Sequence, residues 1–263
     1  MTKTRQTYRR PRSVFITGAS SGLGRALAVA YAERGMTLFI CGRNADGLDM
    51  TAAACRDRKA AVHPYIFDVN NALEATSALN DANRIKPIDL VIANAGVSGG
   101  VLGTKENALS TQQILKTNIF GVVNTILPSI DIMKQNGGGQ LAIISSIAGY
   151  RGLSSCPAYS ASKACVKAWG EGLRGSLKPD RIAVSVICPG FIETPMTDKN
   201  QFKMPFIMRP EKAARIIRSR LTRAPAIIAF PRIMAFGAWL GSILPACVAH
   251  PIMGLFPKKE TRF

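Results

Sequence analysis

Near its amino terminus the chain passes from a short apolar run through a glycine-rich turn into a segment with helical periodicity. The run SVFIT covers residues 13–17, GASSGLG follows, and RALAVAYAERG is expected to be helical up to Gly35. A strand that turns through glycines into a helix is the context that a nucleotide-binding motif requires. Gly18, Gly22 and Gly24 would let the backbone turn tightly and approach a pyrophosphate at the start of the helix. The sequence therefore predicts a phosphate-binding βα unit at this point.

The alternation of apolar runs and helical periodicity continues along the chain. Strands are expected at residues 36–43, 61–68, 88–96, 137–146, 181–190 and 226–230, and helices at 45–58, 71–85, 105–135, 158–177 and 210–221. Pro128 is expected to kink or break the helix 105–135. This order predicts an α/β fold, a Rossmann-like doubly wound parallel sheet of about seven strands with helices on both faces. A ligand of such a sheet lies across the carboxyl ends of the strands.

Composition indicates a globular protein, because 47% of the 263 residues are hydrophobic and 19% are charged. The six cysteines show no CxxC spacing and fall mostly in apolar segments, so we expect buried thiols in a reducing compartment. His63 and His250 are far apart in sequence and neither is near a Cys or carboxylate cluster, so no metal site is expected. The first residues, MTKTRQTYRRPR, lack the apolar core of a signal peptide. We therefore expect a cytoplasmic protein that begins with a basic flexible arm.

The net charge of +18 favours anionic partners, such as phosphates, acidic lipids or an acidic carrier of the substrate. The basic residues are spread along the chain, and no nucleic-acid recognition motif accompanies them. Nucleic acid is therefore not expected as a partner.

The segment SSIAGYRGLSSCPAYSASK, residues 145–163, carries the residues best suited to catalysis. Tyr159 precedes Lys163 by four residues, so both lie on one face of a helix. An ammonium beside a phenol favours the phenolate and would lower the pKa of Tyr159 toward neutrality. Ser146 ends the apolar strand LAIIS, with its hydroxyl free to bind a carbonyl oxygen. The alternative is that Tyr159 and Lys163 are two solvated helix residues.

Two further polar residues stand out. Arg43 ends the second expected strand, beside the place where a doubly wound sheet holds the adenosine ribose. An acidic residue there would bind the 2′-hydroxyl, whereas Arg43 suits a 2′-phosphate and favours NADPH over NADH; the alternative is a surface arginine. Asn118 lies in the apolar helix 105–135, where an amide needs partners. Asn118 is therefore either a structural hydrogen-bonding residue or one that holds a water near the reacting group.

Taken together, these motifs resemble those of the short-chain dehydrogenase/reductase family, which comprises NAD(P)-dependent oxidoreductases with a Rossmann fold. The matching pieces are TGASSGLG (17–24), Asp68-Val69, NAG (94–96), Asn118 in NIFG, Ser146, YSASK (159–163) and PGFIET (189–194). They occur in the order typical of the family and cover roughly residues 13–195.

The resemblance implies a role for each matching residue. Tyr159 would be the general acid/base, and Lys163 would lower its pKa and bind the nicotinamide ribose. Ser146 would polarise the substrate carbonyl, which Ser145 fits less well, and Asn118 would anchor a proton-relay water. The cofactor would be bound by the pyrophosphate turn (Gly18, Ser20, Ser21, Gly22, Leu23, Gly24), the adenine residues (Asp68, Val69), the edge residues (Asn94, Ala95, Gly96), and the nicotinamide loop (Pro189, Gly190, Ile192, Thr194). Arg43 resembles the cation of members that prefer NADP.

The activity that the resemblance implies is hydride transfer between NADP(H), or alternatively NAD(H), and an apolar substrate that is a ketone or aldehyde in one direction and an alcohol in the other. A 3-oxoacyl-thioester reductase acting on an acyl carrier protein or CoA is the alternative, and a cofactor-binding regulator without catalysis is a third reading. The resemblance also implies a homodimer or homotetramer paired through residues 105–135 and 158–177. We expect one catalytic domain at 13–230, after the arm at 1–12, with a substrate lid at about 191–222.

The carboxyl-terminal extension, residues 231–263, departs from the family pattern. Residues 233–257 contain no Asp, Glu, Lys or Arg. A helix from 233 to 244, ending before Pro245, would be about 18 Å long at ~1.5 Å per residue. The hydrocarbon core of a bilayer is ~30 Å thick, so this helix is not expected to span a membrane. The remaining alternatives are a lid over the substrate, an oligomer contact, or a helix on a membrane surface beside Arg232 and Lys258–Lys259.

Overall fold

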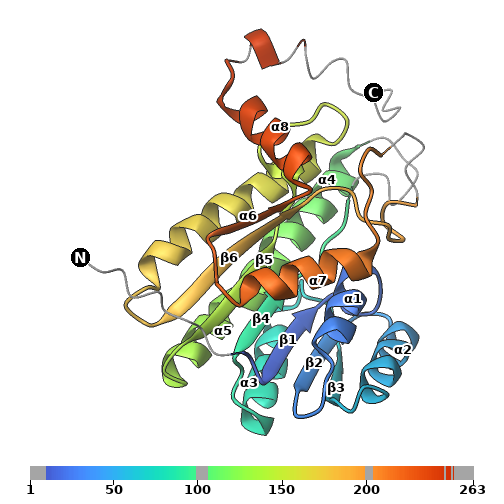
Figure 1. Ribbon diagram of the computed structural model, residues 1–263, viewed down its shortest axis with the longest axis vertical. Helices are drawn as coiled ribbons and strands as arrows, with labels where there is room; N and C mark the ends of the chain where they lie inside the picture. The colour runs from blue at the N-terminus through green and yellow to red at the C-terminus, as the bar shows by residue number, and fades with distance from the viewer. Residues whose placement is uncertain (1–9, 99–105, 199–203, 246, 250, 252–263) are drawn as a thin grey trace.

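The computed structural model of the chain describes residues 10–98, 106–198, 204–245, 247–249 and 251. These residues form one parallel sheet of seven strands in the order β3-β2-β1-β4-β5-β6-β7 (Figure 1). The strands are β1 (Ser13–Thr17), β2 (Thr37–Gly42), β3 (Ala61–Ile66), β4 (Leu90–Ala93), β5 (Gly139–Ile144), β6 (Ile182–Pro189) and β7 (Ile227–Phe230). The predicted doubly wound Rossmann-like sheet is confirmed.

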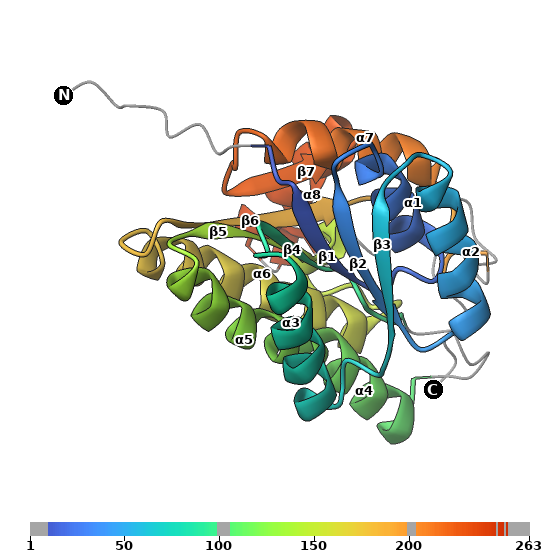
Figure 2. The same cartoon turned by 90° about the horizontal axis from the view of Figure 1, so that it is seen from below.

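Helices cover both faces of the sheet (Figure 2). One layer contains α1 (Gly22–Tyr31), α2 (Ala45–Arg56) and α7 (Pro210–Leu221). The opposite layer contains α3 (Ala72–Ile85), α4 (Ala108–Leu115), α5 (Gly121–Gln135) and α6 (Pro157–Ser176). Each layer has its own apolar core, because the strands carry large side chains such as Ile16 and Phe15 on alternate faces. α8 (Arg232–Ile243) follows directly after β7.

Several elements end earlier than the sequence predicts. β2, β3 and β4 end at Gly42, Ile66 and Ala93, so the expected endpoints Arg43, Asp68 and 96 lie beyond the sheet. After β3 and β4 apolar residues continue beyond the sheet edge, because Phe67, Val69 and Ala95 line a cavity at the ends of the strands. α1 ends at Tyr31 instead of Gly35, which has φ +87° in the turn that leads into β2.

The expected helix 105–135 is interrupted, although not at Pro128. α4 leads into a π-helical segment, Lys116–Phe120, in which the Gly121 N–H bonds the Lys116 carbonyl, and α5 then continues through Pro128. Gly121 lies so close to the loop after β3 that an added Cβ would come within 2.6 Å of Val69. This contact with a segment distant in sequence is invisible to helical periodicity.

The cysteines are only partly as expected. Cys41, Cys55 and Cys188 are buried, Cys156 is partly exposed, and Cys165 and Cys247 are exposed. Cys165 points outward because its helical neighbours Lys163 and Val166 face the core.

β3 forms one edge of the sheet and contains Pro64. Its pairing with β2 is bounded by two backbone bonds, from the Ala61 N–H to the Met36 carbonyl and from the Phe67 N–H to the Gly42 carbonyl.

Parts of the expected flanking segments lie outside the described residues: 1–9 of the basic arm, 199–203 of the lid, and 246, 250 and 252–263 of the carboxyl-terminal extension. Within the described extension, α8 matches the helix expected at 233–244 to within one residue. Among the described helices, none is both long and apolar enough to cross a bilayer.

Candidate active site

A cavity of about 520 Å³ runs along the carboxyl ends of the strands, from the turn after β1 to the loop after β6. All the residues predicted to bind a cofactor border it: Gly18, Ser20, Ser21, Gly22, Leu23, Gly24, Arg43, Asp68, Val69, Asn94, Ala95, Gly96, Tyr159, Lys163, Pro189, Gly190, Ile192 and Thr194. Ser146 also borders the cavity, whereas Asn118 lies behind its wall. The topology therefore brings together residues that are up to 176 positions apart in sequence.

The turn after β1 has no room for a side chain at Gly18 or Gly24. Gly18 has φ +67°, and a Cβ on Gly24 would collide with the Gly18 carbonyl oxygen. The Asn94 side chain donates to the carbonyls of Thr17 (2.9 Å) and Gly18 (3.2 Å), while the Thr17 hydroxyl accepts from the N–H groups of Asn94 and Ala95 (both 3.1 Å). The end of β4 thus holds the glycine turn in shape.

The amino terminus of α1 fits a diphosphate. Its N-cap residue, Ser21, makes no side-chain capping bond, and its first turn carries no acidic residue. The N–H groups of that turn and the helix dipole are therefore available to an anion. A Cβ on Gly22 would approach the Thr194 side chain to 3.1 Å, so the glycine keeps the cavity open between the two loops. These features fit the pyrophosphate of a dinucleotide.

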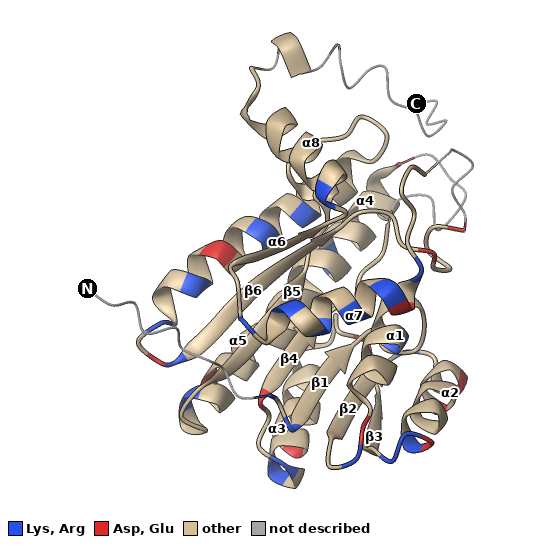
Figure 3. Ribbon diagram, viewed as in Figure 1, with Lys and Arg blue, Asp and Glu red and all other residues tan. Residues whose placement is uncertain are grey.

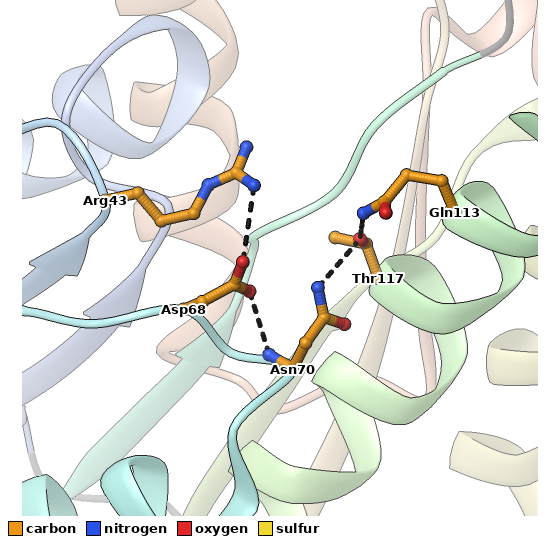
Figure 4. A network of polar contacts seen from close by, with 5 residues as sticks. All are labelled: Arg43, Asp68, Asn70, Gln113 and Thr117. Atoms are coloured by element: carbon orange, nitrogen blue, oxygen red, sulfur yellow. Dashed lines mark hydrogen bonds and ion pairs between the residues drawn. The ribbon is translucent and has the colours of Figure 1, made fainter.

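The far end of the cavity holds an exposed ion pair (Figure 4). Arg43 Nη1 lies 3.3 Å from Asp68 Oδ2, and the two side chains are 61% and 38% exposed. Asp68 is fixed from its other oxygen, which accepts from the Asn70 N–H at 2.9 Å. Exposed ion pairs contribute little free energy, so the guanidinium can turn to another anion at small cost.

At the other end of the cavity, Ser146 lies within hydrogen-bonding reach of the Tyr159 phenol. The Ser146 hydroxyl also accepts from the Ala148 N–H at 3.1 Å and lies 3.5 Å from the Pro189 carbonyl. Ser145, in contrast, donates to the Lys163 carbonyl at 2.7 Å and is 2% exposed. Ser145 therefore joins β5 to α6, and Ser146 presents its hydroxyl beside the phenol.

The expected lowering of the Tyr159 pKa is wrong for this structure. Burial raises the pKa of Tyr159 to about 12, against the lowering effect of its hydrogen bond with Ser146. The Lys163 ammonium instead donates to the Ile144 carbonyl at 3.0 Å and lies 5.7 Å from the phenol ring centre. Burial lowers the pKa of Lys163 to about 8. Low dielectric surroundings disfavour the charged form of both groups.

Asn118 uses its side chain structurally. Its Nδ2 donates to the Val97 carbonyl and the Ser162 hydroxyl, both at 2.9 Å, and its Oδ1 accepts from the Val97 N–H at 2.8 Å. It therefore ties the loop after β4 to α6. A Cβ on Gly96 would come within 3.1 Å of Asn118 Oδ1 and 3.4 Å of Lys163 Nζ, so a side chain at this corner would press on both of these residues.

Sequence reasoning missed several residues of the site. The further lining residues that were not singled out are Gly42, Asn44, Phe67, Val97, Thr117 and Ile144, most of them next to a predicted residue. Ser145, judged the weaker fit beside Ser146, and Pro195, Met196 and Thr197 of the expected lid also line the cavity. Sequence reasoning also missed Glu106, whose carboxylate accepts from the Ala158 N–H at 2.8 Å, at the start of the helix that carries Tyr159. An anion at that terminus stabilises the helix. The 52 residues between these two partners explain why no local pattern indicated the contact.

In the described part of the chain, no group of three or more His, Cys, Asp or Glu side chains could hold a metal ion.

Comparisons with known proteins agree with this geometry. A family model described as short chain dehydrogenase matches residues 12–204. An uncharacterized oxidoreductase of Myxococcus xanthus is 36% identical over 237 residues, which cover 89% of this chain and 93% of the relative. The crystal structure of a short chain dehydrogenase from Mycobacterium paratuberculosis bound to NAD superposes with a TM-score of 0.76 at 21% identity, covering 86% of this chain and 98% of that one. The crystal structure of an actinorhodin polyketide ketoreductase variant with NADPH superposes with a TM-score of 0.75 at 24% identity, covering 85% of this chain and 97% of that one. At these identities, the two structures show the shared fold.

Proposed function

The chain belongs to the short-chain dehydrogenase/reductase family, and we propose that it is an NADP(H)-dependent oxidoreductase that interconverts a carbonyl and an alcohol on an apolar substrate. Structures of similar fold hold NAD or NADPH. The observation that carries the proposal is the placement of Ser146, Tyr159 and Lys163 in one cavity with the glycine turn.

The residues support carbonyl reduction by proton donation. With its pKa raised to about 12, Tyr159 is protonated at neutral pH and can deliver a proton to the substrate oxygen. The Ser146 hydroxyl donates a hydrogen bond to the same oxygen as negative charge develops on it. Lys163 remains largely cationic at pH 7 and stabilises the phenolate that proton donation leaves behind. A bound nicotinamide would supply the hydride.

The preference for NADP(H) rests on Arg43. The residue before it at the end of β2, Gly42, has no carboxylate to bind a ribose 2′-hydroxyl. A 2′-phosphate would draw the exposed Arg43 guanidinium away from Asp68 and accept hydrogen bonds from its N–H groups.

The proposal of an apolar substrate is based on the residues that line the cavity near Pro189 and Gly190. Ile192 and Met196 border the cavity there, and Ile192 pairs with Met208 in an isolated bridge. Methionine adapts to irregular apolar shapes, which suits a hydrophobic ligand.

Turnover tests the proposal directly. We expect the protein to oxidise NADPH with at least one member of a panel of apolar ketones and aldehydes that also contains a 3-oxoacyl thioester. Tyr159→Phe should lower kcat by at least about 100-fold, because the proton donor is lost, while NADPH still binds. Tyr65→Phe is the matched control, because the Tyr65 hydroxyl donates to Asp81 (2.7 Å) and Tyr65 does not line the cavity. Full activity of Tyr159→Phe would remove the proposed acid.

Two other results would redirect the proposal. NADPH binding without turnover of the whole panel would favour a cofactor-binding regulator, and turnover of the thioester alone would favour the 3-oxoacyl-thioester reductase.

Cofactor choice is tested by fluorescence titration of NADPH and NADH with Arg43→Ala. We expect NADPH affinity to fall about tenfold or more, as for a lost charged hydrogen bond, with NADH affinity unchanged. Equal affinity of the wild type for both cofactors, untouched by the substitution, would defeat the role of Arg43.

A further inference from the structure

α8 packs with its large apolar side chains outward. Ile233, Phe236 and Ile243 are 62%, 62% and 58% exposed, while the small residues Ala238 and Gly241 are on the partly buried side. No residue of the helix is fully buried. A surface helix of a globular protein normally turns its apolar stripe toward the core. The outer face of α8 therefore lacks a partner within the described chain.

The exposed side chains form a continuous stripe. Ile233, Phe236, Leu240 and Ile243 recur at intervals of three and four, so they share one face of the helix. Trp239 flanks them, with its ring 5.8 Å from that of Phe236. Aromatic and long aliphatic side chains on one face are typical of helices that lie in the interface of a bilayer.

The orientation of α8 is fixed by contacts at both of its ends. At its start, a Cβ on Gly190 would come within 3.2 Å of Met234 Sδ, so the first turn packs on the loop after β6. At its end, Arg151 Nη1 donates to the carbonyls of Gly241 (2.7 Å) and Leu244 (2.8 Å). The helix projects from the body of the molecule (Figure 1), and its apolar stripe is presented outward.

The charge of the surrounding sequence selects the partner. In the sequence, Arg232 on one side and Lys258–Lys259 on the other border the apolar segment, no Asp or Glu occurs from 212 to 259, and the chain as a whole carries a net charge of +18. α8 itself has no charged residue after Arg232 in its first turn (Figure 3). Apolar side chains flanked by cations match an anionic lipid surface. A second copy of the chain would bring like charge to the same place.

We propose that α8 docks this protein peripherally on an anionic bilayer, with Ile233, Phe236, Trp239, Leu240 and Ile243 entering the interface. The helix lies along the surface and does not cross it. If the proposed function holds, the docked helix also brings the substrate end of the cavity near the lipid, because Met234 in its first turn borders Gly190 of the cavity wall. The substrates are then apolar ketones or alcohols dissolved in the membrane.

Trp239 allows docking to be observed directly, because the chain has only two tryptophans. Trp169→Phe removes the other one, which packs partly buried against the core. With this variant we expect the emission of Trp239 to shift to shorter wavelength on phosphatidylcholine vesicles that contain phosphatidylglycerol, and brominated lipid to quench it. No shift and no quenching on these vesicles would overturn the proposal.

Cosedimentation with the same vesicles tests the stripe itself. The double variant Phe236→Glu, Trp239→Glu should lose vesicle affinity by about tenfold or more, because it places two charges in the interface. Leu73→Glu is the matched control: Leu73 is 83% exposed on α3, and its substitution should change nothing. Thermal unfolding of both variants checks that the fold is intact.

Equal sedimentation of wild type and double variant would overturn the proposal, since charge elsewhere would then bind the lipid. A change of oligomeric state in the double variant, measured by light scattering without lipid, would overturn it in favour of a contact between copies. The turnover of a water-dispersed ketone separates the two proposals. If the wild type oxidises NADPH fully but does not bind vesicles, only the docking proposal fails. If it binds vesicles but shows no turnover, only the proposed activity fails.

Discussion

Replacing Lys163 by methionine should make the protein more stable and inactive at the same time. Burial lowers the pKa of Lys163 from its ordinary value of 10.5 to about 8, so the folded state holds an unfavourable buried charge at pH 7. One pKa unit corresponds to ~1.4 kcal/mol, which sets this cost at about 3 kcal/mol. Methionine has similar length and no charge, but it leaves the Ile144 carbonyl without its donor, which costs about 1–2 kcal/mol. We expect a net gain of about 1–2 kcal/mol in the free energy of unfolding at pH 7.

The pH dependence gives this prediction its sign. Below pH 8 Lys163 is protonated in both the folded and the unfolded chain, so the cost is constant. Between pH 8 and 10.5 the unfolded chain binds the proton more tightly than the folded one, and the wild type becomes more stable as pH rises. The variant lacks this contribution. Its advantage should therefore shrink through this window and reverse near pH 10, where only the lost hydrogen bond remains.

Urea unfolding of both proteins at a series of pH values from neutral to alkaline would measure the difference, and the subtraction cancels other titrating groups that behave alike in both proteins. Lys178→Met, at an exposed position, is the control and should stay within about 0.5 kcal/mol of the wild type. A difference between Lys163→Met and the wild type that is the same at every pH would refute the reasoning, because it would mean that Lys163 titrates alike in both states.

Two further substitutions test the packing. Gly24→Ala should abolish dinucleotide binding and cost about 1–3 kcal/mol in thermal unfolding, because its Cβ collides with the Gly18 carbonyl; unimpaired binding would show that the turn can yield. Arg151→Ala should increase amide hydrogen exchange in α8, because two charged hydrogen bonds of about 1.5–3 kcal/mol each are lost; unchanged exchange would mean that the contacts at Gly190 suffice.

Local patterns were enough to predict the sheet and the glycine turn that borders the cavity. Strands that are buried on both faces appear in the sequence as continuous apolar runs, such as SVFIT in β1. The helices between them can be recognised from apolar residues spaced three and four apart. The glycines of the turn after β1 could be recognised because tight backbone packing leaves no alternative residue there. The edge and nicotinamide residues then followed from the resemblance to a family, which carries information that one sequence does not contain by itself.

What the sequence could not predict depends on partners distant along the chain. The π-helical segment around Asn118 accompanies a close approach of α5 to Val69, and the start of α6 is held by Glu106. The pKa of Tyr159 was misjudged because spacing gave its distance from Lys163 but neither the burial of the pair nor the Ile144 carbonyl that binds the ammonium. For α8, an apolar composition all round concealed which face would point outward.

The place of Pro64 in β3 bears on how the protein behaves in a crowded solution. The N–H groups of Ala61 and Phe67 both point toward β2, and alternate residues of a strand face the same side, so the nitrogen of Pro64 faces the free edge. That edge therefore lacks a donor at its centre. A strand from another molecule cannot extend the sheet there with an unbroken ladder, which protects an otherwise open parallel sheet from edge-to-edge aggregation.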